Sequence, residues 1–242
     1  MRFNLTFFVR SATLATALSV ISLAQAAVTL DRTRIVFEGD QPSINISIRN
    51  DNPEMPYLAQ SWLEDASEQK LTTGPIIATP PIQRMEPQKM SIVRLSTTPG
   101  ASQLPQDRES LFYYNLREIP PKSEEAGVLQ IALQSRVKLF YRPAALVEQS
   151  KKNWEKQVTL TPVAGGYQID NPTGFHLTVI GLGNTKKQAE ESDFDSVMIA
   201  PKTTQKIKSD NFATPYLTYI NDFGGKPSLA FRCRAAKCTV VE

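Results

Sequence analysis

The chain has 242 residues, and its 27 Lys and Arg against 24 Asp and Glu leave a formal net charge of +3 at pH 7. A balance this close to zero gives no basis for nucleic acid as a bulk partner, so any positive site must be local. The 17 prolines and 11 glycines favour many short strands and turns over helices.

The first residues predict a secretory signal peptide covering residues 1–26. Arg2 and Arg10 flank a short positive start, residues 11–23 are apolar or small, and a sequence of the A-x-A form ends at Ala26. No later segment reaches the roughly 18 apolar residues of a membrane span. We therefore expect cleavage after Ala26 and an exported, soluble protein without stable membrane insertion.

Short apolar runs with turn residues between them fill the first half of the mature chain, which is typical of a β-sandwich. The expected strands cover residues 28–37, 43–49, 57–63, 91–97 and 110–118, with two further apolar patches in the proline-rich segment 74–87.

The run over residues 129–141 is the most regular of these strands. Apolar residues occupy every odd position except Ser135, which is the period of a strand with one apolar face. Thirteen residues would extend roughly 43 Å, about twice the usual strand length. The pattern alone favours one long core strand, or two strands broken by a bulge near Ser135 and Arg136. The alternative is a strand that partly overhangs and offers its apolar row to another chain.

Pro143 ends this run, because proline cannot continue a strand ladder. The polar stretch 148–156 follows, so we place a boundary there, with one domain over residues 27–147 and a second over 148–242. The acidic segment 188–195 is expected to be a mobile loop, and it is the one place in the second half where a short helix could form. The expected strands of the second domain cover residues 157–163, 167–170, 175–182, 197–200, 205–208, 216–220 and 228–232.

Cys233 and Cys238 are the two cysteines of the chain. In an exported protein such a pair is expected to form a disulfide, and two cysteines are too few for a cysteine-only metal site. The closed loop is small, so the bond would stabilise the terminal hairpin by only roughly 2 kcal/mol.

Catalytic motifs are missing from the sequence. His176 is the single histidine, and we expect it to be a half-buried strand residue without a carboxylate or serine motif beside it. The acidic residues between 190 and 195 fit no calcium-binding loop, and no phosphate- or dinucleotide-binding loop occurs. We therefore expect a binding protein, not an enzyme, with no cofactor and no metal.

Two basic residues, Arg34 and Lys138, stand in otherwise apolar strands. Together with motifs that run in order along the whole mature chain, they make the sequence resemble the periplasmic pilus chaperones of the PapD type, which act in the chaperone–usher system. The motifs are Asp31-Arg-Thr-Arg34, Ala78-Thr-Pro-Pro81, Arg94-Leu-Ser-Thr97, Leu104-Pro-Gln-Asp-Arg-Glu-Ser-Leu-Phe112, Asn115-Leu-Arg-Glu-Ile-Pro-Pro121, Lys138-Leu-Phe-Tyr-Arg-Pro143, Asn171-Pro-Thr173, Tyr219-Ile-Asn-Asp-Phe-Gly-Gly225 and the terminal cysteine pair.

The resemblance implies an all-β protein: two immunoglobulin-like β-sandwich domains in a boomerang arrangement with a cleft between them. Arg34 and Lys138 match the two cleft residues that anchor the C-terminal carboxylate of a pilus subunit. Leu129, Ile131 and Leu133 match the strand residues that the chaperone donates to an incomplete subunit. Residues 137, 139 and 141 are then expected in the core of the first domain, with Lys138 facing the cleft.

The resemblance also implies that Glu109, Arg142 and Asp222 form ion pairs between the domains. The short loop 120–128 resembles the short-loop branch of the family. The implied partners are pilus or fimbrial subunits and an outer-membrane usher, and the implied location is the periplasm. An alternative is a secreted adhesion or carbohydrate-binding β-sandwich protein. A pilus subunit is a third possibility, but it would usually have one domain and an alternating N-terminal extension.

Overall fold

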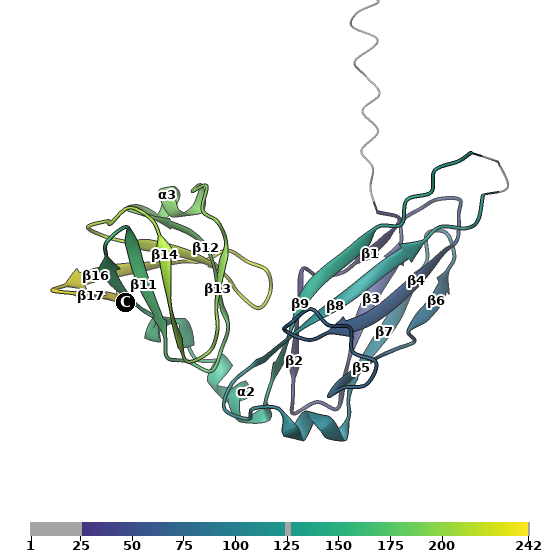
Figure 1. Ribbon diagram of the computed structural model, residues 1–242, viewed down its shortest axis with the longest axis horizontal. Helices are drawn as coiled ribbons and strands as arrows, with labels where there is room; N and C mark the ends of the chain where they lie inside the picture. Colours follow the sequence, from purple (N-terminus) through teal and green to yellow (C-terminus); the bar gives the residue numbers. More distant parts are fainter. Residues whose placement is uncertain (1–25, 124–126, 242) are drawn as a thin grey trace, which may run out of the picture.

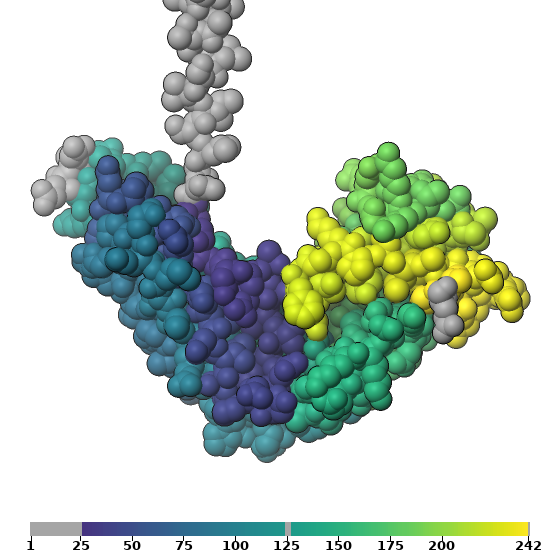
Figure 2. Space-filling view, turned by 180° about the vertical axis from the view of Figure 1, so that it is seen from behind, coloured from purple at the N-terminus to yellow at the C-terminus, as the bar shows by residue number. Residues whose placement is uncertain are grey.

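The computed structural model describes residues 26–123 and 127–241. The predicted signal peptide lies outside the described residues except for Ala26. Two β-domains meet at an angle, as the ribbon in Figure 1 shows, and the space-filling view in Figure 2 shows the open cleft between them. Each domain has a separate buried apolar core. We call the two halves domain one (β1–β9) and domain two (β10–β17).

Domain one is a sandwich of two sheets with strand orders β1-β3-β7-β5 and β2-β9-β8-β4-β6. Its core lies between the sheets and includes Ile35, Phe37, Leu95 and Leu139. The strands are β1 (Val28–Leu30), β2 (Arg34–Glu38), β3 (Ser43–Asn50), β4 (Tyr57–Glu64), β5 (Ile76–Thr79), β6 (Ile82–Met85), β7 (Met90–Thr97), β8 (Ser110–Ile119) and β9 (Gln134–Arg142).

The strand expected over residues 28–37 is two strands. The chain bends at the polar residues 31–33, so β1 pairs antiparallel with β3 in one sheet while β2 pairs parallel with β9 in the other. The segment 74–87 also divides, because Pro80 and Pro81 separate β5 from β6 and place them in different sheets. Each of these two divisions places one short strand in each sheet of the sandwich.

The single strand expected over residues 129–141 was wrong in its first half, because β9 begins only at Gln134. Its neighbour β8 ends at Ile119 and is followed by Pro120 and Pro121, which have no N–H to donate. The last backbone contact runs from the Glu118 N–H to the Leu133 carbonyl, at 3.0 Å. Residues 128–133, which we call the unpaired segment, therefore lie beyond the ladder and have neither helix nor strand structure.

Domain two is built from eight strands in the order β13-β12-β15-β16-β17-β10-β11-β14. The first part of β16 pairs with β15 and its last part with β17, so this strand links the two layers. The strands are β10 (Thr159–Val163), β11 (Gly166–Asn171), β12 (Leu177–Gly183), β13 (Val197–Ile199), β14 (Thr203–Lys208), β15 (Tyr216–Ile220), β16 (Ser228–Arg234) and β17 (Lys237–Val240).

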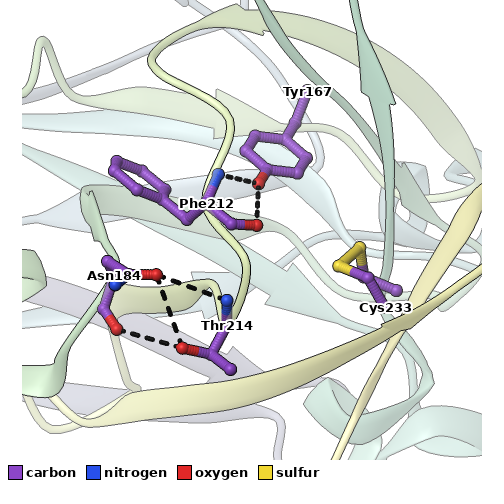
Figure 3. The surroundings of a disulfide bond; sticks show 6 residues. Tyr167, Asn184, Phe212, Thr214 and Cys233 are labelled. Atoms are coloured by element: carbon purple, nitrogen blue, oxygen red, sulfur yellow. Dashed lines mark hydrogen bonds between the residues drawn. A yellow bond between two sulfur atoms is a disulfide. The ribbon is translucent and has the colours of Figure 1, made fainter.

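The disulfide predicted between Cys233 and Cys238 is confirmed. The two residues lie opposite each other on β16 and β17 and close the terminal hairpin (Figure 3). The same view shows the Tyr167 hydroxyl accepting a hydrogen bond from the Phe212 N–H (2.6 Å) and donating one to the Phe212 carbonyl (3.1 Å). These bonds hold the segment before β15 against the domain core.

Short helices connect the elements. A 3₁₀ helix (Pro99–Gln103) precedes β8 and a second one (Trp154–Gln157) precedes β10. The helix α3 (Lys186–Glu190) follows β12 and overlaps the start of the segment 188–195, which was expected to be mainly a loop. The helix α2 (Ala144–Ser150) was not predicted and spans the position where we placed the domain boundary. Its buried Leu146 lies against Gly174 of domain two, so α2 packs at the junction of the domains.

Candidate functional site

Two cations stand side by side on the cleft face of domain one. Arg34 on β2 is the register partner of Lys138 on β9 in the parallel pair. The next residues, Ile35 and Leu139, point into the core, so the alternation of a strand directs Arg34 and Lys138 to the opposite face. Both side chains are half-buried. We call Arg34 and Lys138 the cation pair.

Burial makes the cation pair electrostatically costly. Loss of solvent lowers the pKa of Arg34, and the charges of Asp222 and Glu109 oppose this shift only in part. Burial also lowers the pKa of Lys138, and the adjacent charge of Arg34 adds to the effect. Within the described part of the chain, neither cation has a carboxylate oxygen within 4.0 Å. Such a site favours an anion that would restore the missing opposite charge.

Arg34 also connects the two domains. Its guanidinium donates a hydrogen bond of 3.0 Å to the carbonyl of Ile220, at the end of β15 in domain two. The same group lies 5.7 Å from the ring centroid of Phe140. The position of Arg34 is therefore set from both sides of the cleft, which favours a preformed anion site.

The structure brings Glu109, Arg142 and Asp222 together. Arg142, at the end of β9, donates to Glu109 Oε1 from Nε (2.9 Å) and Nη2 (2.8 Å). It also donates from Nη1 to Asp222 Oδ2 (2.8 Å) and from Nη2 to Asp222 Oδ1 (3.1 Å). Burial acts to lower the pKa of Arg142, but the bond to Asp222 and the two carboxylate charges outweigh burial and raise it. Arg142 thus links both domains through a buried guanidinium.

The strand placement expected for His176 was wrong. His176 lies just before β12 and not on a strand, and it has a carboxylate beside it. Its backbone N–H donates to Glu109 Oε2 at 2.8 Å, and its Nδ1 lies 3.1 Å from the same oxygen. The imidazole also packs on Phe140, with ring centroids 5.1 Å apart. Sequence spacing carries no signal for this contact, because the two residues are 67 positions apart. We refer to Glu109, Arg142, Asp222 and His176 as the interdomain network.

Asn171 shapes the loop that carries His176. Its Nδ2 donates to the carbonyls of Phe175 (2.8 Å) and Ala200 (3.2 Å). Its Oδ1 accepts a bond from the Thr173 hydroxyl at 2.6 Å. This explains the Asn-Pro-Thr motif, whose polar side chains replace a backbone ladder where the chain turns from β11 to β12.

The unpaired segment presents apolar side chains to solvent. Leu129 is 84% exposed, Ile131 64% and Leu133 39%. The alternate residues further along, Leu139 and Tyr141, are buried in the core of domain one. The alternating row therefore changes from exposed to buried along the chain, and its exposed part lies outside any sheet.

The neighbouring strands leave β9 with a free edge. On one side β8 pairs with β9 from Gln134 to Tyr141, but on the other side β2 pairs only with Lys138–Arg142. No strand in the described part of the chain pairs with residues 134–137 on that side. We call these residues together with the unpaired segment the free edge. It ends at the cation pair, because β2 begins at Arg34.

The comparisons with known proteins agree with this geometry. The family model of the pili and flagellar-assembly chaperone PapD N-terminal domain matches residues 27–147. The model of the pili assembly chaperone PapD C-terminal domain matches residues 153–231. The chain belongs to the PapD family of pilus-assembly chaperones. This chaperone is 59% identical to the chaperone protein PapD of Escherichia coli over 223 residues, which cover 92% of this chain and 93% of the relative.

Solved structures show the same fold. The periplasmic chaperone SfaE is 29% identical, with a TM-score of 0.67, and the match covers 84% of this chaperone and 98% of that chain. A second similar structure is that of the Salmonella enterica SafA pilin in complex with the SafB chaperone. The match has a TM-score of 0.72 and 21% sequence identity, and it covers 88% of this chaperone and 99% of that chain. Among the described residues, no helix is long and apolar enough to cross a membrane, and no cluster of three or more His, Cys, Asp or Glu is arranged to hold a metal ion.

Proposed function

We propose that this chaperone captures pilus subunits in the periplasm by adding the free edge of β9 to an incomplete subunit fold. The observation that carries the proposal is the direct continuity of an exposed apolar row, an unpaired strand edge and a cation pair along one segment. Donation of Leu129, Ile131 and Leu133 would bury side chains that are now exposed. Burying a Leu or Ile side chain fully stabilises by about 1.5–3 kcal/mol, so three such residues supply a useful driving force.

The cation pair would fix the direction and register of the subunit. A subunit strand with its C-terminal carboxylate on Arg34 and Lys138 has only the free edge along which to lie. It must then approach the cations from the direction of residue 128, which makes it parallel to β9, as β2 already is. Extended as a strand, the edge from residue 128 to residue 138 would span about 33 Å, enough for a strand of ordinary or greater length. Backbone pairing would give affinity and the alternate side chains specificity.

The interdomain network would hold the cleft at the angle that this binding requires. It joins Glu109 and Arg142 of domain one to Asp222 and His176 of domain two. The strands of each half pair only within that half, which supports domain limits of 27–147 and 148–242. A fixed angle keeps Ile220 of domain two against Arg34.

Delivery to an outer-membrane usher would complete the cycle, after cleavage of the signal peptide behind Ala26 and export to the periplasm. The chaperone strand keeps the apolar groove and the open edge of the subunit covered until another subunit segment replaces it, and an uncovered edge would aggregate. This exchange of one strand for another requires no nucleotide or cofactor. The complex of SafB with the SafA pilin is a precedent in a protein of the same fold.

The test is co-production of this chaperone with a cognate pilus subunit in the periplasm, followed by pull-down of the complex. We expect Lys138→Ala and Arg34→Ala to fold but to recover at least about tenfold less subunit, since a hydrogen bond to a charged group contributes about 1.5–3 kcal/mol. Lys206→Ala, on the exposed face of β14, is the matched control and should recover wild-type amounts. Undiminished recovery from both cleft variants would overturn the anchor assignment.

A further inference from the structure

Phe223 is the most exposed large apolar side chain in the described part of the chain, at 97%. It lies in the turn that joins β15 to β16 in domain two and borders the cleft. A cavity of about 570 Å³ between the domains is lined by Phe223 together with Arg34, Val36 and Ile44. The interdomain network and the core of domain two do not use this ring.

The turn holds Phe223 in place. Asn221 Oδ1 accepts hydrogen bonds from the N–H groups of Phe223 (3.1 Å) and Gly225 (2.8 Å). The preceding residue, Asp222, is bound to Arg142. The following residue, Gly224, has a φ of +81° and lies so close to domain one that a Cβ on it would be 2.9 Å from Thr33 Oγ1.

Asp222 is thus bonded to domain one and Gly224 lies close against it, so the backbone of the turn cannot move away from domain one without breaking the bonds between Asp222 and Arg142. A turn whose backbone is already ordered has little backbone entropy to lose on binding. Aromatic side chains contribute strongly to the energetics of protein interfaces.

We propose that Phe223 is a contact residue for the bound pilus subunit and packs against apolar side chains close to the subunit's C-terminal carboxylate. The inference rests on the proposed function. Arg34, half of the cation pair, lines the same cavity as Phe223 and donates to the carbonyl of Ile220, three residues before the ring. A chain end bound at the cation pair therefore lies beside this turn.

The charge of the turn also fits a carboxylate ligand. Asp222, next to Phe223, is paired with Arg142, so the turn does not present a free negative charge to the incoming chain end. In a strand added to the free edge, every second side chain points toward domain two, where the ring stands. The contact thus selects subunits whose last residues carry apolar side chains on that face.

The first experiment measures burial directly. Cys233 and Cys238 are joined in the disulfide and no described cysteine is free, so Phe223→Cys introduces a single reactive thiol. Met90→Cys is the matched control, because Met90 is 64% exposed and lies on β7 in the sheet of domain one that does not contain β9. Maleimide labelling rates are compared for the free chaperone and for its complex with a co-produced pilus subunit. We expect at least tenfold protection at position 223 and less than twofold at position 90.

Equal labelling of the Phe223→Cys variant in the free and bound states would overturn the inference. So would protection that rises with the concentration of the chaperone alone, because that result would assign the ring to contact with a second copy of the chain.

The second experiment measures the energetic contribution. Phe223→Ser should release the subunit about tenfold faster than the wild type, with unchanged thermal unfolding, while Met90→Ser should not alter release. The cleft variants separate the two proposals. If Arg34→Ala abolishes capture but Phe223→Ser releases at the wild-type rate, only the role of Phe223 fails. If Arg34→Ala captures normally, the proposed anchoring fails first.

Discussion

The two ends of the segment from residue 128 to Arg142 differ in almost every physical respect. At the Arg142 end, β9 has a neighbour on both sides, core side chains beneath it and a guanidinium bonded to two carboxylates. At the other end, residues 128–133 have no strand neighbour in the described structure and expose four large apolar side chains, those of Val128, Leu129, Ile131 and Leu133. The difference teaches that one alternating pattern can serve stability at one end and remain available for binding at the other.

The cation pair stands where these two ends meet. Lys138 is the first residue of β9 that pairs with β2, and the free edge stops there. Cations deprived of solvent and of carboxylate partners are unfavourable in the isolated protein, so binding of an anion would relieve a cost that folding leaves in place. The predictions below separate the two ends, beginning with the largest effect.

Removal of Arg142 should give the largest loss of stability, at the Arg142 end of the segment. Arg142→Ala leaves Glu109 buried without its main partner, and breaking a buried ion pair in this way typically costs about 3–5 kcal/mol. We expect a drop of this size in the free energy of unfolding measured in urea. Arg32→Ala is the control, since the exposed pair of Arg32 with Asp31 should contribute less than about 1 kcal/mol. Similar unfolding midpoints for the two variants would contradict the assigned role.

Matched substitutions in the apolar row should give opposite results at the two ends. Leu139→Ala removes a fully buried side chain and should lower the free energy of unfolding by about 2–5 kcal/mol. Ile131→Asp should leave unfolding nearly unchanged, because the side chain is exposed, but should strongly reduce subunit recovery. Thermal unfolding and periplasmic pull-down measure the two effects. A collapse of the thermal stability of Ile131→Asp would place this residue in the core and refute the donor assignment.

The sequence pattern predicted the buried end of this segment well and the exposed end poorly, for a physical reason. Leu139 and Tyr141 follow the alternation into the core, because period two fixes which face of a strand a residue occupies. Where β9 begins depends on how far its neighbouring strands extend. The strand β8 ends before Pro120, and β2 begins only at Arg34, opposite Lys138. A local pattern carries no information about either.

The site residues also fall into a group that could be predicted and a group that could not. Arg34, Lys138, Glu109, Arg142 and Asp222 were selected through resemblance to a family, and the structure brings them to one cleft. The contact of His176 with Glu109 was missed, because only the folding of domain two against domain one brings these residues together. The exposure of Phe223 was also missed, since an aromatic residue beside two glycines gives no indication of whether its ring is buried or presented.

The smallest effect concerns the pH dependence of subunit binding at the cation pair. Burial and the neighbouring Arg34 lower the pKa of Lys138 below its ordinary value of 10.5, so this residue loses its proton at a lower pH than an exposed lysine does. The carboxylate it is proposed to bind favours the protonated form, so subunit affinity should decrease as pH rises toward 10.5. The decrease should begin below the titration range of exposed lysines.

Lys138→Arg separates this titration from other alkaline effects, because arginine stays protonated throughout the range. The ratio of wild-type to Lys138→Arg affinity, measured between pH 7 and pH 10, should fall as pH rises. A ratio that stays constant over this range would mean that the charge of Lys138 does not contribute to binding. Binding of the subunit carboxylate would then depend on Arg34 alone, and the free edge would end at one functional cation instead of two.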